Sequence, residues 1–154
     1  MADWNYPFSG SKQAAQFLRD EGLSNLPIVA CQEAQVAPLS GYLDKPIYYL
    51  QSSGFVSHGD PGRSLEELSA RQVLTKTLQL ARQMHQNVVL VLVYRSLGLR
   101  RTGARFASAR INADGLIISS STPGLPSCAT IKLLGEFHCC IDELYTVYLI
   151  QPDQ

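Results

Sequence analysis

The stretch Val88-Val89-Leu90-Val91-Leu92-Val93-Tyr94 is the most informative part of the sequence for the fold. An unbroken run of apolar residues, rich in β-branched valine, is typical of a β-strand. Because no polar residue alternates with the apolar ones, we expect both faces of this strand to be buried. A strand of this kind lies at the centre of a sheet that carries helices on both faces.

A long helix is predicted immediately before this strand. Ser64 and Glu67 form a capping box, in which each side chain bonds the other residue's backbone amide. Apolar residues then recur at helical spacing to about Gln86. The preceding segment, Gln51–Arg63, is rich in serine, glycine and proline and is predicted to be a loop.

The N-terminal third alternates between helices and strands. Ser9 and Ser11 are candidate N-caps of a first helix, which Gly22 ends. The elements predicted next are a strand at Pro27–Cys31, a brief helical turn at Glu33–Leu39 limited by Pro38, and a strand at Pro46–Leu50.

The C-terminal third predicts two strands, Thr130–Phe137 and Leu144–Ile150, whose short link favours antiparallel pairing. Between Arg95 and Pro126 only Gly115–Ser119 resembles a strand. The whole pattern predicts one α/β layered domain over residues 1–154. It would have a mostly parallel sheet flanked by helices and an antiparallel C-terminal strand pair.

The composition excludes several classes of protein. Of the 154 residues 45% are hydrophobic, so disorder is not expected, and 13 basic residues balance 13 acidic ones. This balance gives no reason to expect a nucleic-acid partner. The longest apolar run, Val88–Tyr94, is too short to cross a bilayer. Met1–Asn5 does not begin a signal peptide, so we expect a soluble domain.

No strong catalytic motif occurs: the chain has no phosphate-binding loop, nucleophile elbow, zinc-binding helix or dinucleotide fingerprint. We therefore expect no cofactor and no catalytic residue. The four cysteines, Cys31, Cys128, Cys139 and Cys140, lack the spacing of a zinc site. They are interpreted as buried thiols that act as small hydrophobic residues, and no metal is expected.

Three weaker features are candidates for binding. His58 and Asp60 lie in the loop after the second strand, where acid–base or metal chemistry competes with ordinary turn formation by Asp-Pro-Gly. A cluster of arginines, unaccompanied by acidic residues, could bind phosphate, a lipid headgroup or an anionic glycan, or could be a solvated loop. Its members are Arg95, Arg100, Arg101, Arg105 and, further along, Arg110.

Tyrosines accompany the predicted strands. Such rings line carbohydrate and lipid sites, but tyrosine is also an ordinary residue of strands, and we expect packing in the core or at the sheet edge. The tyrosines are Tyr42, Tyr48, Tyr49, Tyr94, Tyr145 and Tyr148.

Segments at both ends of the chain resemble one family. Asn5–Leu18, Leu26–Val29 and Gly41–Tyr49, with Lys132–Phe137 and Ile141–Ile150, resemble the soluble C-terminal part of membrane glycosyltransferases that use polyprenyl-phosphate sugars. The group is the protein mannosyltransferase and lipid A aminoarabinose transferase type. Arg95–Ser127 shows no such likeness.

The resemblance implies an α/β domain outside the cytoplasm, packed on the membrane portion of a parent protein. It implies no catalytic residue here, because the family's catalytic acids lie beside its transmembrane helices. Tyr48, Tyr49 and Glu143 match as strand positions. We therefore expect an accessory domain that positions an acceptor or braces the membrane part. It would be either a domain excised from a larger membrane protein or a stand-alone relative that has lost its membrane half.

Two other hypotheses remain open. The chain could be a soluble α/β enzyme or binding protein that acts on an anionic small molecule through the Arg95–Arg105 cluster and the loop of His58 and Asp60. It could also be a self-associating interaction domain. Without the family resemblance, the expected location is the cytoplasm.

Overall fold

A computed structural model describes residues 10–31, 33–51, 54–56, 68–94, 108–111, 117–118, 129–138 and 144–153. Its helices are α1 (Ser11–Asp20), α2 (Glu33–Leu43) and α3 (Ala70–Met84). Its strands are β1 (Ile28–Ala30), β2 (Ile47–Tyr49), β3 (Gly54–Val56), β4 (Val88–Tyr94), β5 (Ser108–Ile111), β6 (Ile117–Ile118), β7 (Ala129–His138) and β8 (Leu144–Pro152).

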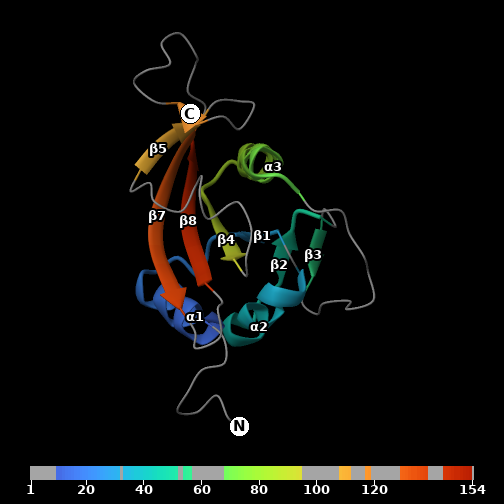
Figure 1. The fold of residues 1–154 in the computed structure, drawn as a ribbon, viewed down its shortest axis with the longest axis vertical. Helices are drawn as coiled ribbons and strands as arrows, with labels where there is room; N and C mark the ends of the chain where they lie inside the picture. Colours follow the sequence, from blue (N-terminus) through green and yellow to red (C-terminus); the bar gives the residue numbers. More distant parts are fainter. Residues whose placement is uncertain are drawn as a thin grey trace.

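The strands form one mixed sheet in the order β3-β2-β1-β4-β8-β7-β5-β6 (Figure 1). Strand β1 runs parallel to β2 and to β4, whereas β7 and β8 form an antiparallel pair. The predicted α/β class, parallel core and antiparallel C-terminal pair are confirmed. Antiparallel pairing extends further than expected, because β4 also pairs antiparallel with β8 and short strands border both edges.

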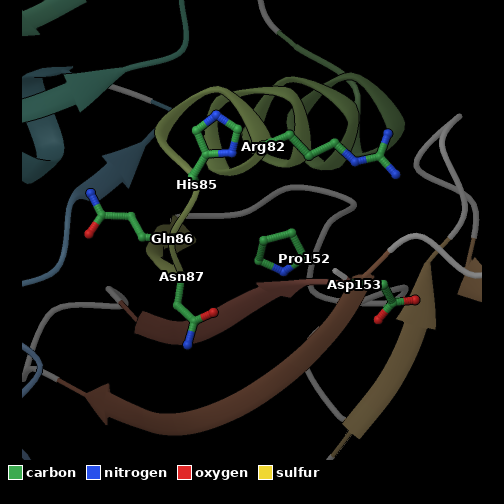
Figure 2. Close-up of a pocket in the computed structure, with 6 residues that line it drawn as sticks. All are labelled: Arg82, His85, Gln86, Asn87, Pro152 and Asp153. Atoms are coloured by element: carbon green, nitrogen blue, oxygen red, sulfur yellow. The ribbon is translucent and has the colours of Figure 1, made fainter.

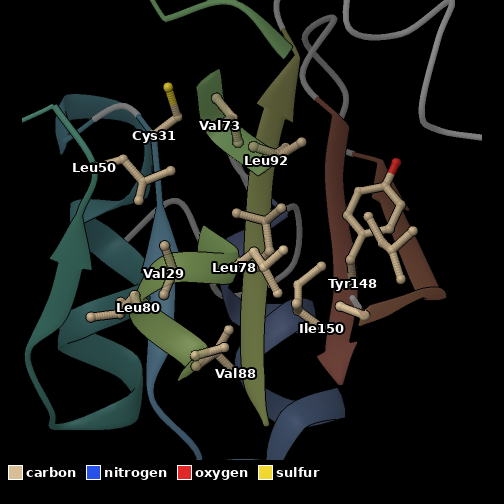
Figure 3. Packing of buried hydrophobic residues seen from close by; sticks show 14 of the residues in the cluster. Val29, Cys31, Leu50, Val73, Leu78, Leu80, Val88, Leu92, Tyr148 and Ile150 are labelled. Carbon is tan, nitrogen blue, oxygen red and sulfur yellow. The ribbon is translucent and has the colours of Figure 1, made fainter. Parts of the chain in front are cut away.

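Strand β4 is buried on both faces, as its continuous apolar sequence predicts. Val88, Leu90 and Leu92 belong to the apolar cluster beneath α3, whereas Val89 and Val91 belong to the cluster beneath α1 and α2. Figure 3 shows the first cluster, in which Leu78 and Leu80 of α3 lie near β1 and β4. The sheet is therefore the middle of three layers, with α1 and α2 on one face and α3 on the other (Figure 1).

The first helix begins between the two positions that its candidate serine caps predict. Gly10 is the N-cap of α1 and Ser11 is its first helical residue, so the prediction of Ser11 as a cap is wrong. Ser9 lies outside the described residues. Gly22 ends the helix as predicted, with φ of +70°. The amide of Leu23 donates to the Leu18 carbonyl at 2.8 Å, and the amide of Gly22 donates to that of Arg19 at 3.1 Å, which is a Schellman motif.

Two other helix boundaries also differ from expectation. Pro38 does not stop α2, which continues to Leu43, because proline removes one amide donor without preventing the next turns. Helix α3 begins at Ala70, where Ser69 and Gln72 form the capping box. The predicted box of Ser64 and Glu67 lies outside the described residues.

Strand β3 lies within Gln51–Arg63, which was predicted to be a loop. It pairs antiparallel with β2, so the chain turns back toward the amino-terminal ends of the parallel strands before residue 57. Strand β5 was also missed, whereas Ile117–Ile118 falls within the strand-like stretch Gly115–Ser119. Among the described helices, none has the length and apolar character needed to cross a membrane.

Candidate functional site

Most of the predicted site residues lie outside the part of the chain that the structure describes. These are His58, Asp60, Arg95, Arg100, Arg101 and Arg105. Arg110 belongs to β5, where it pairs with Ile118 of β6 and Thr130 of β7. The chemistry assigned to the His58 loop and to the arginine cluster therefore remains a prediction.

One premise behind the His58 loop is corrected by the topology. The loop was expected to follow directly from the carboxyl end of β2, where open α/β sheets bind ligands. Strand β3 intervenes, and it carries the chain away from that end. The order of the strands instead favours the carboxyl ends of β1 and β4. Strand β2 lies on one side of β1 in the sheet and β4 lies on the other side. Helix α2, which follows β1, and helix α3, which precedes β4, lie on opposite faces of the sheet. Arg95 follows β4 directly in the sequence.

A cavity of about 380 Å³ lies at the other end of β4, between the end of α3 and the end of β8. Arg82 and His85 come from the last turn and cap of α3, and Gln86 and Asn87 link α3 to β4. Pro152 and Asp153 close the opposite wall from β8 (Figure 2). This volume lies within the usual range for small-molecule pockets.

Local backbone geometry positions this wall. His85 adopts the left-handed conformation, with φ of +54° and ψ of +37°, and its amide bonds back to the Ala81 and Arg82 carbonyls. The helix therefore stops abruptly, and Gln86 and Asn87 turn into β4. Because Val88 pairs with Ile150, residues 85–87 are brought beside residues 151–153.

The electrostatics of the pocket are mixed. Arg82 contributes a guanidinium, His85 an imidazole and Asp153 a carboxyl group. The two amides of Gln86 and Asn87 both donate and accept hydrogen bonds. Helix α3 contains no aspartate or glutamate, so its own charges are all positive.

A second, smaller cavity of about 160 Å³ lies on the other side of α3. Lys76, Gln79 and Gln83 of the helix face Tyr48 and Leu50 across it, and Leu80 completes the lining. It is too small for most metabolites but has a similar composition of amides and one cation.

The tyrosines confirm the packing interpretation where the structure describes them. Tyr49, Tyr145 and Tyr148 are buried, and Tyr42 and Tyr48 are half-buried against the two apolar clusters. Tyr94 ends β4 beside Leu144 of β8.

Within the described ranges, no three His, Cys, Asp or Glu side chains lie close enough together to hold a metal ion. Cys31 is buried and forms no disulfide, in agreement with its interpretation as a small hydrophobic residue. Cys128, Cys139 and Cys140 lie outside these ranges.

Lys45 is the described group whose titration is clearly perturbed. Its ammonium donates to the carbonyls of Ser24 and Leu26, at 2.8 Å each. Burial lowers the pKa of Lys45 below its ordinary value of 10.5. Both carbonyls belong to the segment before β1, and Lys45 follows α2 in the chain. The two hydrogen bonds therefore hold these segments together, which indicates a structural role for Lys45.

Sequence reasoning missed the pocket at the end of α3. The relevant signal was the polar break Gln86-Asn87 between the helix and its strand, together with Pro152-Asp153 after the last strand. Connecting the two required the pairing of β4 with β8, which the sequence did not reveal. Comparison with protein-family models, curated proteins and solved structures yields no match.

Proposed function

We propose that this chain is a non-catalytic accessory domain of the kind that forms the C-terminal part of polyprenyl-phosphate-sugar-dependent membrane glycosyltransferases. In this role it lies outside the cytoplasm, packs on the membrane portion of a parent protein, and braces that portion or positions the acceptor. The alternatives are a soluble enzyme or binding protein for an anionic small molecule and a self-associating domain.

The supporting observation is that the two separated segments of the family resemblance pack together. Helix α1, from the N-terminal segment, contacts β7 and β8, from the C-terminal segment. The rings of Phe17 and Phe137 are 5.3 Å apart between centroids, with planes inclined by 52°. Gly10 lies against the Phe137 carbonyl and the Tyr145 ring.

This packing supports the proposal because a likeness split between both ends of a chain carries more weight when the ends form one structural unit. The middle segments of the resemblance belong to the same unit. Leu26–Val29 leads into β1, and Gly41–Tyr49 contains the end of α2 and all of β2. Together they form the face of the domain on which α1 and α2 lie.

The proposal predicts that in its native cell the domain is part of a membrane protein. An antibody raised against the folded chain would be used to probe soluble and carbonate-washed membrane fractions. We expect a membrane-retained polypeptide much larger than 16.9 kDa. Protease added outside intact spheroplasts should release the epitope, whereas a cytoplasmic marker should survive.

A soluble antigen of 16.9 kDa and no larger species would overturn the proposal. Sedimentation of that soluble species would then separate the alternatives. A dimer or larger assembly favours the self-associating domain, and a monomer favours the enzyme or binding protein.

A further inference from the structure

We propose that the outward side of α3 rests on an anionic lipid surface, which turns this side of the domain toward the membrane. The inference rests on the proposed function, because that function places the domain beside a bilayer. The outward side of the helix carries two cations and a row of glutamines. These residues form the α3 ridge: Gln72, Lys76, Gln79, Arg82 and Gln83.

Charge is distributed unevenly along this neutral chain. Eight of its 13 basic residues lie between Leu68 and Ala113, a segment that contains none of its 13 acidic residues. Helix α3 belongs to this segment. The acidic residues of the described chain lie on or beside α1 and α2, on β7 and after β8. Of the described helices, α3 is therefore the one that an anionic surface attracts most strongly.

Two cations of α3 are available to a partner. Arg71, in the first turn, already has an interaction of its own. Lys76 is half-buried and Arg82 is exposed, and the helix offers neither of them an acidic residue. Cations on long side chains need not be held in one position to attract a layer of lipid headgroups, because they respond to the surface potential of many charges.

The two cations lie on different flanks of the helix. Lys76 lines the cavity toward β2, whereas Arg82 lines the cavity toward the end of β8 (Figure 2). Six residues at about 100° each place them about 120° apart around the axis of a helix that is about 10–12 Å across. A small anion bound to one cation therefore does not reach the other. A broad anionic surface contacts both.

The glutamines between the cations suit the same partner. Gln72, Gln79 and Gln83 are exposed, and their uncharged amides both donate and accept hydrogen bonds. Phosphate oxygens and glycerol hydroxyl groups of lipid headgroups accept from these amides, and the hydroxyl groups also donate to them. The ridge has no apolar side chain, so we expect it to lie among the headgroups without inserting into the acyl chains.

The test measures partition of the purified chain onto vesicles by flotation. Vesicles of phosphatidylcholine are compared with an equal mixture of phosphatidylcholine and phosphatidylglycerol. Each cation near an anionic surface contributes about a factor of five, so we expect about 30-fold stronger partition onto the mixed vesicles. This difference should hold at about 0.1 M salt, where the Debye length is about 10 Å, and disappear at about 1 M, where it is about 3 Å.

Two double variants test whether the ridge is responsible. Lys76→Gln with Arg82→Gln leaves the ridge uncharged and should lower partition onto the mixed vesicles about 30-fold, to the level of phosphatidylcholine. Lys12→Gln with Lys132→Gln removes the same charge from exposed positions on the other side of the sheet. This control should leave partition nearly unchanged. A matching amide spectrum for each variant, away from the substitutions, shows that the fold is retained.

Four results would overturn the proposal. They are equal partition onto the two kinds of vesicle, equal losses in the two double variants, continued binding of the ridge variant, and displacement by free glycerophosphoglycerol at the same headgroup concentration. Equal losses would indicate attraction to the whole chain, and continued binding would indicate another site. Displacement by the free headgroup would indicate a small-anion site.

The flotation result is separable from the test of the proposed function. Flotation uses the chain alone, whereas the fractionation experiment asks whether the native polypeptide is large and retained by membranes. Failure of flotation with a membrane-retained parent would reject the ridge and keep the accessory-domain function. A native antigen that is soluble and small would reject that function whatever the vesicles show.

Discussion

Gly10 occupies a position where a side chain has no room. A Cβ atom built there would lie 2.8 Å from the Phe137 carbonyl oxygen and 3.1 Å from the Tyr145 ring. Because one of these neighbours is backbone, it cannot move aside cheaply. We expect Gly10→Ala to lower the free energy of unfolding by about 1–3 kcal/mol, measured by urea denaturation.

Gly41 provides the matched control for this substitution. It is exposed within α2, and a Cβ built there meets nothing within 4 Å. Gly41→Ala should raise the free energy of unfolding by up to about 1 kcal/mol, because alanine has the higher helix propensity. Equal effects of the two substitutions would show that the close approach at Gly10 is not a constraint.

His85 is held in the left-handed region, which side chains disfavour. His85→Gly should therefore raise the free energy of unfolding by about 0.5–1 kcal/mol, even though it removes a side chain. The control is Gln86→Gly, one residue later, where φ is not positive and the same change should be destabilising. A loss of stability in His85→Gly would contradict the argument.

Lys45 joins the end of α2 to the segment before β1 through its bonds to the Ser24 and Leu26 carbonyls. Lys45→Met should lower the free energy of unfolding by about 1–2 kcal/mol, because both bonds are lost. Lys12→Met, on the exposed side of α1, removes the same charge and should have little effect.

The effect of Lys45 should also depend on pH. Burial lowers the pKa of Lys45 in the folded state, so between that value and 10.5 the unfolded chain binds more protons. Stability from this group therefore rises with pH across that interval. We expect the gap between the unfolding free energies of wild type and Lys45→Met to widen from neutral to alkaline pH, and a narrowing gap would refute the assignment.

At the scale of the elements, α1 is attached to the sheet through an aromatic pair. Phe17 of α1 and Phe137 of β7 are both half-buried, with ring centroids 5.3 Å apart. Phe17→Ala should lower the free energy of unfolding by about 2–3 kcal/mol, which is less than the loss expected for a fully buried ring. A double-mutant cycle with Phe137→Ala should show a coupling of about 0.5–1.5 kcal/mol.

Leu78 is the reference for that cycle, because it lies in the cluster on the opposite face of the sheet. The costs of Phe17→Ala and Leu78→Ala should add within about 0.5 kcal/mol. A coupling between Phe17 and Phe137 no larger than this would mean that α1 is attached by apolar burial alone.

Elements with a strong local pattern were predictable. The apolar run Val88–Tyr94 predicts strand β4 correctly. Gly22 ends α1 because glycine readily adopts the positive φ that is required there. The boundaries failed where two local signals compete. Ser69 with Gln72 forms the capping box of α3, whereas the sequence pattern favoured Ser64 with Glu67, which lie outside the described residues.

The three-residue strand β3 was missed for a different reason. Gly54–Val56 is too short to show alternation, and it is a strand because Tyr48 of β2 lies opposite Phe55. Non-local pairing likewise created the pocket at the end of α3. The sequence shows that polar residues follow α3 and β8, but these residues come close together only because β4 lies beside β8.

At the scale of the whole molecule, β4 makes the two apolar clusters parts of one core. Leu90 packs in the cluster under α3, and the next residue, Val91, packs in the cluster under α1 and α2. Because these residues share one backbone that pairs with both β1 and β8, neither cluster can lose its strand without disturbing the other. We therefore expect the described domain to unfold as a single cooperative unit.

Substitutions on the two faces of β4 test whether the two apolar clusters unfold together. Leu90→Ala should cost about 2–5 kcal/mol and Val91→Ala about 1–3 kcal/mol. Fluorotyrosine labelling reports on both sides, because Tyr148 belongs to the first cluster and Tyr49 and Tyr145 to the second. In either variant the three ¹⁹F signals should be lost at one common urea concentration. Persistence of the Tyr49 and Tyr145 signals after Tyr148 has unfolded would show that the sheet separates two independent cores.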